Sequence, residues 1–244
     1  MKIRLDKWLG ALNQGSRKQV QTLIRSGAVR AGEETVTDPG RSFDPGRTRL
    51  TVRGIPLDGR LTRHLMLHKP AGVLTATEDR RLPTVADLLP EPVRKRNPGP
   101  VGRLDRDVTG LVIMTTDGQL AHRLISPKWK AEKVYRARCA GRLTEADVAR
   151  FAGGVALSDF TAKPAGLAVI AADDAESVAD VTLTEGKFHQ VKRMFAAVGH
   201  PLIGLHRLRI GCVTLDDALA PGECRPLTEE EVAGLYGLCG MDDR

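Results

Sequence analysis

The chain has few cysteines and no long apolar segment. Its 244 residues include four cysteines, at positions 139, 212, 224 and 239, without a CxxC pair or a zinc-finger spacing to histidine. We therefore expect packed, reduced thiols, with a disulfide among the last three as the alternative. A run of about 18 apolar residues, which a membrane-spanning helix needs, is absent, and charges interrupt the first ten residues. We expect a cytoplasmic protein without a signal peptide or a membrane partner.

The usual sequence signatures of cofactor chemistry are also missing. The chain contains no GxxxxGK[ST] phosphate loop, no dinucleotide-binding fingerprint and no HExxH pair. His189, His200 and His206 have no carboxylate in register that would complete a metal site. We therefore expect neither a cofactor nor a metal, and we interpret the three histidines as structural.

Positive charge is concentrated near the N-terminus. Residues 1–60 contain twelve Lys and Arg against six Asp and Glu, a net charge of +6, whereas residues 61–244 contain twenty-five against twenty-four, a net charge of +1. A polyanion such as RNA suits this asymmetry, because phosphate contacts supply affinity that does not depend on base sequence. The length allows two domains, which we place at residues 1–60 and 61–244.

The first domain has the pattern of two helices followed by a hairpin. Apolar residues recur at helical spacing between Arg4 and Leu12, and Ser16 is in the N-cap position of a second helix that Gly27 ends. Residues 28–36 then read as a short hairpin. The second helix has a basic face, which either follows an RNA phosphate track or is simply solvated.

Residues 2–53 resemble the small RNA-binding module named after ribosomal protein S-four. The same module occurs in synthetases and stress proteins, so the resemblance indicates the ligand and not the reaction. It implies that RNA is contacted by Arg4, Lys7, Arg17, Lys18, Arg25 and Arg30. We expect a hinge at residues 60–63, because a module that captures RNA first is expected to move relative to the rest.

The second domain mixes strand and helix signals, which predicts an α+β fold. Residues 65–77 read as two strands joined by a Lys-Pro-Ala-Gly turn, and residues 94–100 as a basic loop that either contacts RNA or is a mobile connection. Thr228 and Glu231 have the spacing of a capping box. Helices are expected near residues 85–89, 119–125, 144–152, 188–198 and 228–238.

Charged residues precede a buried strand in the segment 101–117. Leu111–Met114 is an apolar run typical of a core strand, so the charges beside it need partners. Asp105 could be half of a structural ion pair with Arg103 or another cation. A carboxylate kept ionised by nearby cations is also a competent nucleophile or base. The spacing alone does not decide between these interpretations.

Longer motifs favour the catalytic interpretation. Residues 102–105, 109–111 and 116–118 closely resemble the catalytic signature of pseudouridine synthases. Further matches follow at residues 126–127, 133–135, 184–200, 205–211 and 219–231. Their order is most similar to the RsuA-like branch, which modifies one uridine of small-subunit (16S) ribosomal RNA, and large-subunit relatives share most of these motifs. The resemblance implies a mixed, mainly antiparallel sheet with flanking helices, and we expect a monomer that acts on ribosomal RNA or on an assembly intermediate.

The resemblance also assigns roles to individual residues. Asp105 is the essential carboxylate, either as a nucleophile or as a base, and Arg103 fills the space of the flipped nucleotide, contacts phosphate or pairs with a nearby acid. Tyr135 faces inward by strand alternation and either stacks on the target base or is a core tyrosine. Lys192 pairs with Asp105, although related enzymes often have Arg there. Leu205 forms an apolar wall against the uracil or simply packs in the core.

Two other functions remain as alternatives at this point. A noncatalytic RNA-binding assembly factor would share the basic module, but the presence of Asp105, Tyr135 and Lys192 argues against it. An RNA glycosylase would share base flipping and the carboxylate but would release the base. The mass of the RNA distinguishes the last possibility, because isomerisation leaves it unchanged.

Overall fold

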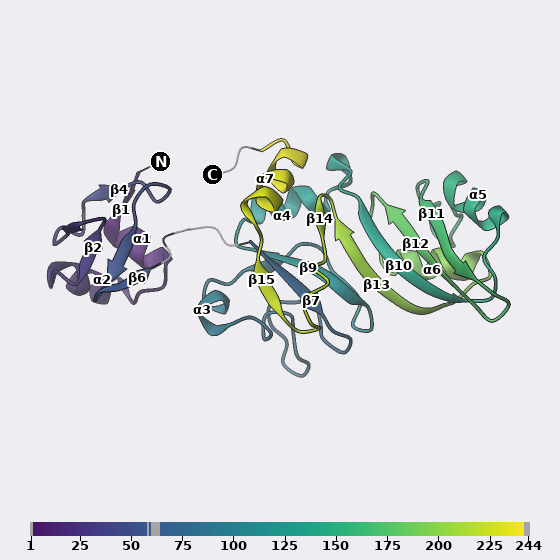
Figure 1. The fold of residues 1–244 in the computed structure, drawn as a ribbon, viewed down its shortest axis with the longest axis horizontal. Helices are drawn as coiled ribbons and strands as arrows, with labels where there is room; N and C mark the ends of the chain where they lie inside the picture. Colours follow the sequence, from purple (N-terminus) through teal and green to yellow (C-terminus); the bar gives the residue numbers. More distant parts are fainter. Residues whose placement is uncertain (1, 58, 60–63, 242–244) are drawn as a thin grey trace. The chain divides into compact units, whose positions relative to one another are not determined.

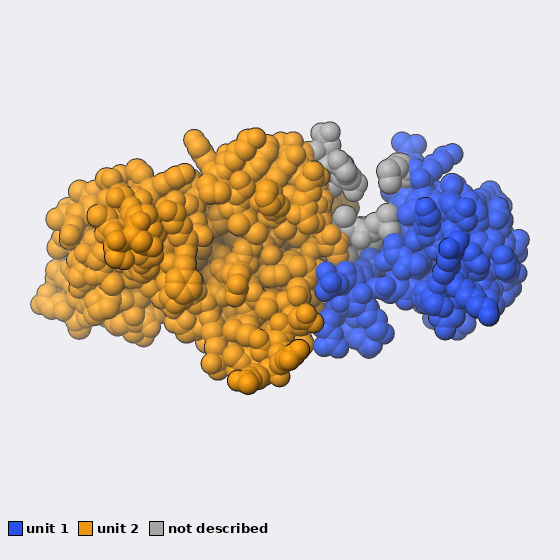
Figure 2. All heavy atoms as spheres, turned by 180° about the vertical axis from the view of Figure 1, so that it is seen from behind, with its two compact units in different colours: residues 1–63, 91–97 blue, residues 64–90, 98–244 orange. Residues whose placement is uncertain are grey.

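The computed structural model describes residues 2–57, 59 and 64–241, which form two compact units (Figure 2). Unit 1 comprises Met1–Arg63 and Glu91–Asn97, and unit 2 comprises His64–Pro90 and Pro98–Arg244. The expected domain boundary after residue 60 and the expected hinge at residues 60–63 lie outside the described residues. Both stay predictions.

Unit 1 is built on two short helices, α1 (Leu5–Ala11) and α2 (Arg17–Arg25) (Figure 1). The apolar residues at helical spacing in α1 are buried, as the pattern predicts. The Ser16 hydroxyl accepts from the Gln19 amide while the Gln19 side chain accepts from the Ser16 amide, so the predicted N-cap is a complete capping box. Gly27 ends the helix with a φ of +74°.

The predicted hairpin of unit 1 is confirmed and is part of a larger sheet. β2 (Val29–Ala31) pairs antiparallel with β3 (Glu34–Thr35). Beyond the prediction, β5 (Leu50–Val52) and β6 (Ile55–Leu57) extend the order to β3-β2-β5-β6. A separate pair is formed by β1 (Ile3–Arg4) and β4 (Ser42–Phe43).

Unit 2 is built on one mixed sheet, which contains nine strands among the described residues. Its path is β11 (Gly166–Ala172), β12 (Glu176–Leu183), β10 (Lys133–Ala140), β13 (Leu202–Ile210), β9 (Thr109–Thr115), β7 (His64–Lys69) and β15 (Cys224–Pro226), with β8 (Gly99–Pro100) beside β9 and β14 (Val213–Thr214) beside β13. Among these described strands the pairing is antiparallel except between β13 and β9. There Arg207 pairs with Gly110 in a short parallel contact. The fold class is α+β with a mainly antiparallel sheet, as predicted.

Four of the five predicted helices are present in unit 2. They are α4 (Gly118–Ile125), α5 (Glu145–Gly153), α6 (Gln190–Ala197) and α7 (Glu229–Leu238). α4 and α7 pack on β7 and β9 in one hydrophobic core, which includes Met66, Leu120 and Leu235. Phe151 of α5 packs edge to face against Phe195 of α6. Two shorter helices were not expected, α3 (Glu91–Arg94), which ends at the first residue of the predicted basic loop, and the 3₁₀ helix η1 (Pro127–Trp129).

The helix predicted near residues 85–89 is wrong. These residues form successive turns, because their polar groups bond to neighbours outside a helical ladder. Asp87 accepts from both the amide and the hydroxyl of Thr84 at 2.9 Å, and the Val85 amide donates to the Leu74 carbonyl. Pro90 also disfavours helical backbone in the residue before it. Leu74 thereby forms an isolated parallel bridge to Thr84, so the second of the two strands predicted in residues 65–77 is wrong as well.

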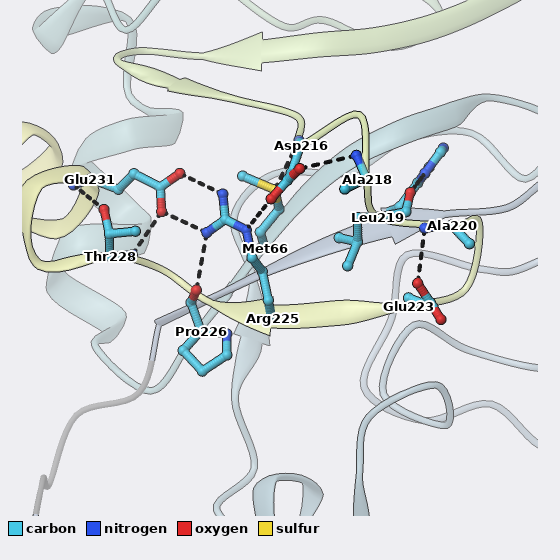
Figure 3. A network of polar contacts seen from close by, with 11 residues as sticks. Met66, Asp216, Ala218, Leu219, Ala220, Glu223, Arg225, Pro226, Thr228 and Glu231 are labelled. Atoms are coloured by element: carbon cyan, nitrogen blue, oxygen red, sulfur yellow. Dashed lines mark hydrogen bonds and ion pairs between the residues drawn. The ribbon is translucent and has the colours of Figure 1, made fainter.

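A polar network around Arg225 attaches α7 to the sheet (Figure 3). The guanidinium donates to Asp216 at 2.8 Å, to both carboxylate oxygens of Glu231 at 2.8 and 2.9 Å, and to the Pro226 carbonyl. Glu231 also accepts from the Thr228 amide, while the Thr228 hydroxyl accepts from the Glu231 amide. The predicted capping box of α7 is therefore confirmed and is joined to an ion-pair network.

The four cysteines are free thiols. Cys139 and Cys239 are buried, but Cys212 is exposed, so the expectation of packed thiols is wrong for that residue. Cys212 lies in the turn between β13 and β14, and its thiol faces α7, where it donates to the Glu231 carbonyl at 3.8 Å. No helix in the described part of the chain is long and apolar enough to cross a membrane.

Candidate active site

Asp105 lies in the loop that leads into β9, at a pocket of unit 2. Its carboxylate is 29% exposed, and its two oxygens face different partners. Oδ2 lies 3.1 Å from Lys192 Nζ, and Oδ1 lies 3.4 Å from His189 Nε2. The structure thus brings together Asp105 and Lys192, the pair that the motifs predicted, and it adds His189, which sequence reasoning had set aside as structural. Arg103 is not the ion-pair partner of Asp105.

Lys192 is shared with a second carboxylate that sequence reasoning missed. Its ammonium donates to both oxygens of Asp107, at 2.8 and 2.9 Å. Burial acts to lower the pKa of Lys192, but the hydrogen bonds to Asp107 and Asp105 outweigh it and raise the pKa above its ordinary value. The hydrogen bond from Lys192 lowers the pKa of Asp107 in turn. The site therefore contains one ammonium between two carboxylates, which keeps Lys192 charged and fixed in direction.

Tyr135 and Leu205 line the same pocket from neighbouring strands. Tyr135 on β10 is only 7% exposed, and alternate residues of that strand are buried, as the predicted alternation requires. Leu205 on β13 is half-buried and is paired in register with Ala137. An aromatic ring and an aliphatic side chain thus form apolar walls beside the carboxylate.

Arg103 lines the pocket but has no structural partner among the residues that the structure describes. Its side chain is exposed, and no described acceptor lies within hydrogen-bonding distance of the guanidinium. The structure therefore does not support the alternative in which Arg103 pairs with a nearby acid, and its expected contact with RNA stays a prediction. A permanently charged, unpaired planar group beside the pocket is instead available to a ligand.

Buried polar contacts hold the backbone on both sides of Asp105. Lys69 is completely buried, and its ammonium donates to the carbonyls of Pro70, Arg106 and Val108 at 3.0, 3.2 and 2.7 Å. Thr75 exchanges hydrogen bonds with the amide and the carbonyl of Leu104. Burial lowers the pKa of Lys69 to about 8. Lys69 was missed as a site-forming residue, although a lysine that ends the apolar strand β7 was an available signal.

Arg207 is a second buried cation behind the pocket. Its side chain is almost fully buried, Nε donates to the Leu111 carbonyl at 2.8 Å, and its guanidinium carbon lies 5.9 Å from the centre of the Tyr135 ring. Nη2 has no hydrogen-bond partner within the described ranges. Arg207 therefore joins β13 to β9 and supports the ring that lines the pocket.

The six basic residues predicted to contact RNA in unit 1 are all exposed, but they are not equivalent. Arg4 donates to the buried Asp6, and Arg30 donates to Glu33. The other four, Lys7, Arg17, Lys18 and Arg25, have no ion-pair partner in the described part of the chain. A shallow pocket on α2 joins Lys18 and Ser16 to Arg53, a basic residue that the prediction omitted.

Comparison with known proteins identifies the kind of protein that has this fold and site. A solved structure described as a pseudouridylate synthase is 36% identical, with a TM-score of 0.66, over 96% of this chain and 99% of that chain. The Bacillus subtilis protein described as the uncharacterized RNA pseudouridine synthase YtzG is 44% identical over 94% of this chain and 97% of its own length. The ribosomal small subunit pseudouridine synthase A of Yersinia pestis is 43% identical over 96% and 98%. The protein is an RNA-modifying isomerase.

The family models agree with this conclusion. The model described as RNA pseudouridylate synthase matches residues 63–197, and the model described as S4 domain matches residues 3–48. The chain belongs to the RNA pseudouridylate synthase family, with an S4 domain at its N-terminus. The resemblance predicted from the motifs is confirmed at the level of the family and of the reaction.

Proposed function

We propose that this protein converts one uridine of small-subunit ribosomal RNA to pseudouridine, with Asp105 as the essential carboxylate. The observation that carries the proposal is the position of Asp105, held by Lys192 in a pocket with Tyr135 and Leu205 as walls. The two relatives from Yersinia pestis and Escherichia coli that are named for the small subunit are 43% and 42% identical over 96% of this chain, which supports that RNA as the substrate.

The reaction places few demands on the protein beyond this geometry. The bond from C1′ to N1 breaks, a bond from C1′ to C5 forms, the hydrogen leaves C5 and N1 gains a proton. The uridine must leave its stack to enter the pocket, and the unpaired guanidinium of Arg103 takes its place in the helix or contacts phosphate. Asp105 then acts on the sugar or the uracil, and the pocket keeps the detached base from leaving.

The other parts of the proposal concern binding. The exposed, unpaired cations of α2 bind RNA phosphate, so that the S4 domain contributes affinity and unit 2 contributes the chemistry. The substrate is ribosomal RNA, either naked or in an assembly intermediate. The protein acts as a monomer in the cytoplasm.

The test is carbodiimide and primer-extension mapping of small-subunit ribosomal RNA from cells that lack this protein. The cells are complemented with wild type or with Asp105→Asn, and the variant is first shown to keep the wild-type melting temperature and RNA affinity. We expect one signal that disappears in the deletion and returns only with wild type. An unchanged small-subunit map, with a signal lost from large-subunit RNA, would assign the enzyme to the other subunit.

A second measurement separates the isomerase from the two alternative functions. Nuclease fragments of the modified RNA should keep their mass and change their chromatographic retention, because isomerisation neither adds nor removes atoms. A fragment that has lost the mass of uracil would indicate a glycosylase. If Asp105→Asn restored the carbodiimide signal as completely as wild type, the signal would not depend on this carboxylate. That result would indicate a noncatalytic assembly factor.

A further inference from the structure

Phe188 is the most exposed of the large apolar side chains in the described part of the chain, and it stands next to the pocket. Its ring is 77% exposed, whereas an apolar side chain of this size is normally buried. Both of its chain neighbours, Lys187 and His189, line the pocket that contains Asp105. The exposed ring therefore lies at the entrance of the site.

The loop that presents Phe188 is held by buried polar contacts. Glu185 is 5% exposed and accepts from the Lys163 amide at 3.0 Å and from the Gln190 side chain at 2.6 Å. Gln190 is also buried, and its side-chain oxygen accepts from the Lys187 amide at 2.9 Å. These bonds hold the backbone on both sides of Phe188 and so fix where its side chain leaves the loop.

Only one face of the Phe188 ring is covered by the protein. The His189 ring stacks on it with a centroid distance of 3.8 Å and an interplanar angle of 18°. His189 has a φ of +49°, a conformation that non-glycine residues rarely adopt, and its Nε2 lies 3.4 Å from Asp105 Oδ1. The stack thus runs from the catalytic carboxylate through His189 to Phe188, whose far face is open to solvent.

Phe160, a second ring near this loop, provides an instructive contrast. The ammonium of Lys187 lies 3.6 Å from the Phe160 centroid, and the guanidinium of Arg193 lies 5.2 Å from it, so cations already occupy that ring. Phe188 has no such cation contact among the described residues. The two cations are thus directed at Phe160, which leaves the face of Phe188 free for a neutral planar group.

We propose that Phe188 is a stacking site for the nucleobase adjacent to the target uridine in single-stranded RNA. The exposed aromatic face supplies the stacking, and the unpaired guanidinium of Arg103 at the same pocket suits a flanking phosphate. A base that stacks on Phe188 extends the row of rings that starts at His189. The next nucleotide along the strand is thereby positioned to enter the pocket at Asp105. The inference rests on the proposed function for the identity of the RNA and for Asp105 as the site of reaction.

The direct test uses a short single-stranded RNA with 2-aminopurine on one side or the other of a single uridine. Stacking on an aromatic ring quenches 2-aminopurine fluorescence, so wild type should quench one of the two probes. Phe188→Trp should keep the quenching, and Phe188→Leu should lose it while remaining apolar. Ile170→Ala is the matched control, because Ile170 is 55% exposed on β11, at the edge of the sheet. Equal quenching by wild type and Phe188→Leu, or no quenching by wild type, would overturn the proposal.

The second readout is tritium release from ribosomal RNA transcripts of each subunit that carry tritium at C5 of uridine. Phe188→Leu should raise KM by about tenfold and leave kcat within about twofold, because stacking contributes affinity and not chemistry. Phe188→Trp should restore the KM. A variant that loses kcat at unchanged KM would contradict a stacking role. Turnover of the large-subunit transcript alone would refute the proposed substrate without affecting the Phe188 comparison.

Discussion

A β-carbon on Gly110 would stand 2.3 Å from the carbonyl oxygen of Arg207, closer than any two such atoms can approach. Gly110 also has a φ of +108°, which disfavours any side chain. These two residues pair in the short parallel contact between β9 and β13. Gly110 therefore permits the two strands to approach each other, and with them the Asp105 loop and the pocket wall at Leu205.

Gly110→Ala should consequently destabilise unit 2 by roughly 2–4 kcal/mol and reduce tritium release at least about tenfold. Gly118→Ala is the control, because a β-carbon at Gly118 meets no atom within 4 Å and the residue is helical. We expect that substitution to leave the melting temperature unchanged or slightly raised. Similar melting temperatures for the two variants would show that β9 and β13 can move apart without a loss of stability.

The activity should depend on the charge of Lys192 more than on the shape of its side chain. Lys192→Met removes the cation that bonds to Asp105 and Asp107, and we expect kcat/KM to fall by about 100-fold, which corresponds to roughly 2.7 kcal/mol. Lys192→Arg should recover most of the activity, because a guanidinium can donate to both carboxylates. An Arg variant as inactive as the Met variant would mean that the site needs the compact ammonium.

The stability of unit 2 should depend on pH through Lys69. Burial lowers the pKa of Lys69 from 10.5 to about 8, so between these values the unfolded chain binds a proton that the folded chain has released. The free energy of unfolding therefore rises with pH in this window, by up to about 1.4 kcal/mol per pH unit. Scanning calorimetry of wild type and Lys69→Met at pH 7.5, 8.5 and 9.5 measures the difference.

We expect wild type to gain stability relative to Lys69→Met as the pH rises. Lys133 has a pKa lowered to about 8 by burial as well, but it is present in both proteins and cancels from the comparison. The exposed Lys163 supplies the control substitution Lys163→Met, which should show no such trend. A difference that stays constant with pH would mean that the carbonyls around Lys69 retain its proton.

The network in Figure 3 should stabilise unit 2 measurably. Arg225→Met leaves two partly buried carboxylates, on Asp216 and Glu231, without their shared cation, and we expect a loss of roughly 1–3 kcal/mol. Arg142→Met is the control, since its partner Asp174 is 95% exposed and such surface pairs contribute at most about 1 kcal/mol. Urea unfolding gives both values, and equal losses would contradict the role of burial.

Unit 1 should bind RNA through its unpaired cations. Arg17→Gln, Lys18→Gln and Arg25→Gln should each weaken binding and reduce the slope of log K against log salt by about 0.7–0.9. Arg30→Gln should change the slope less, because Arg30 already bonds to Glu33. Filter binding of a ribosomal RNA transcript between 50 and 200 mM salt, a range of about fourfold, measures the slope for each variant. Equal slopes for all four variants would argue against the distinction.

The sequence predicted those parts of the fold that have their own local signals. Ser16 with Gln19 and Thr228 with Glu231 cap their helices within four residues, and the alternation around Tyr135 is a property of one strand. The segment at residues 85–89 has no such local signal, because its turns depend on contacts with Leu74. A helical pattern in the sequence cannot reveal a contact with a residue outside the segment. Local signals thus predict elements, and contacts between distant segments can override them.

The site shows the same division. Asp105 and Lys192 were predicted as a pair through motifs, and the structure places them 3.1 Å apart. Asp107 and His189 were missed because their approach depends on how the loop before β9 meets the start of α6, more than 80 residues later. The alternating charges of residues 103–107 were the available signal for Asp107. No pattern in a single sequence could show that His189 turns its ring toward Asp105.

The parallel contact between β9 and β13 divides the sheet of unit 2 into two halves. Asp105 precedes β9 in one half, whereas Tyr135, Lys192 and Leu205 belong to the other half. Only two residue pairs are in register between β9 and β13. A chain in which one half alone had formed would have the carboxylate without its pocket or the pocket without its carboxylate. We therefore expect activity during refolding to recover only when the two halves dock, after the signal from secondary structure.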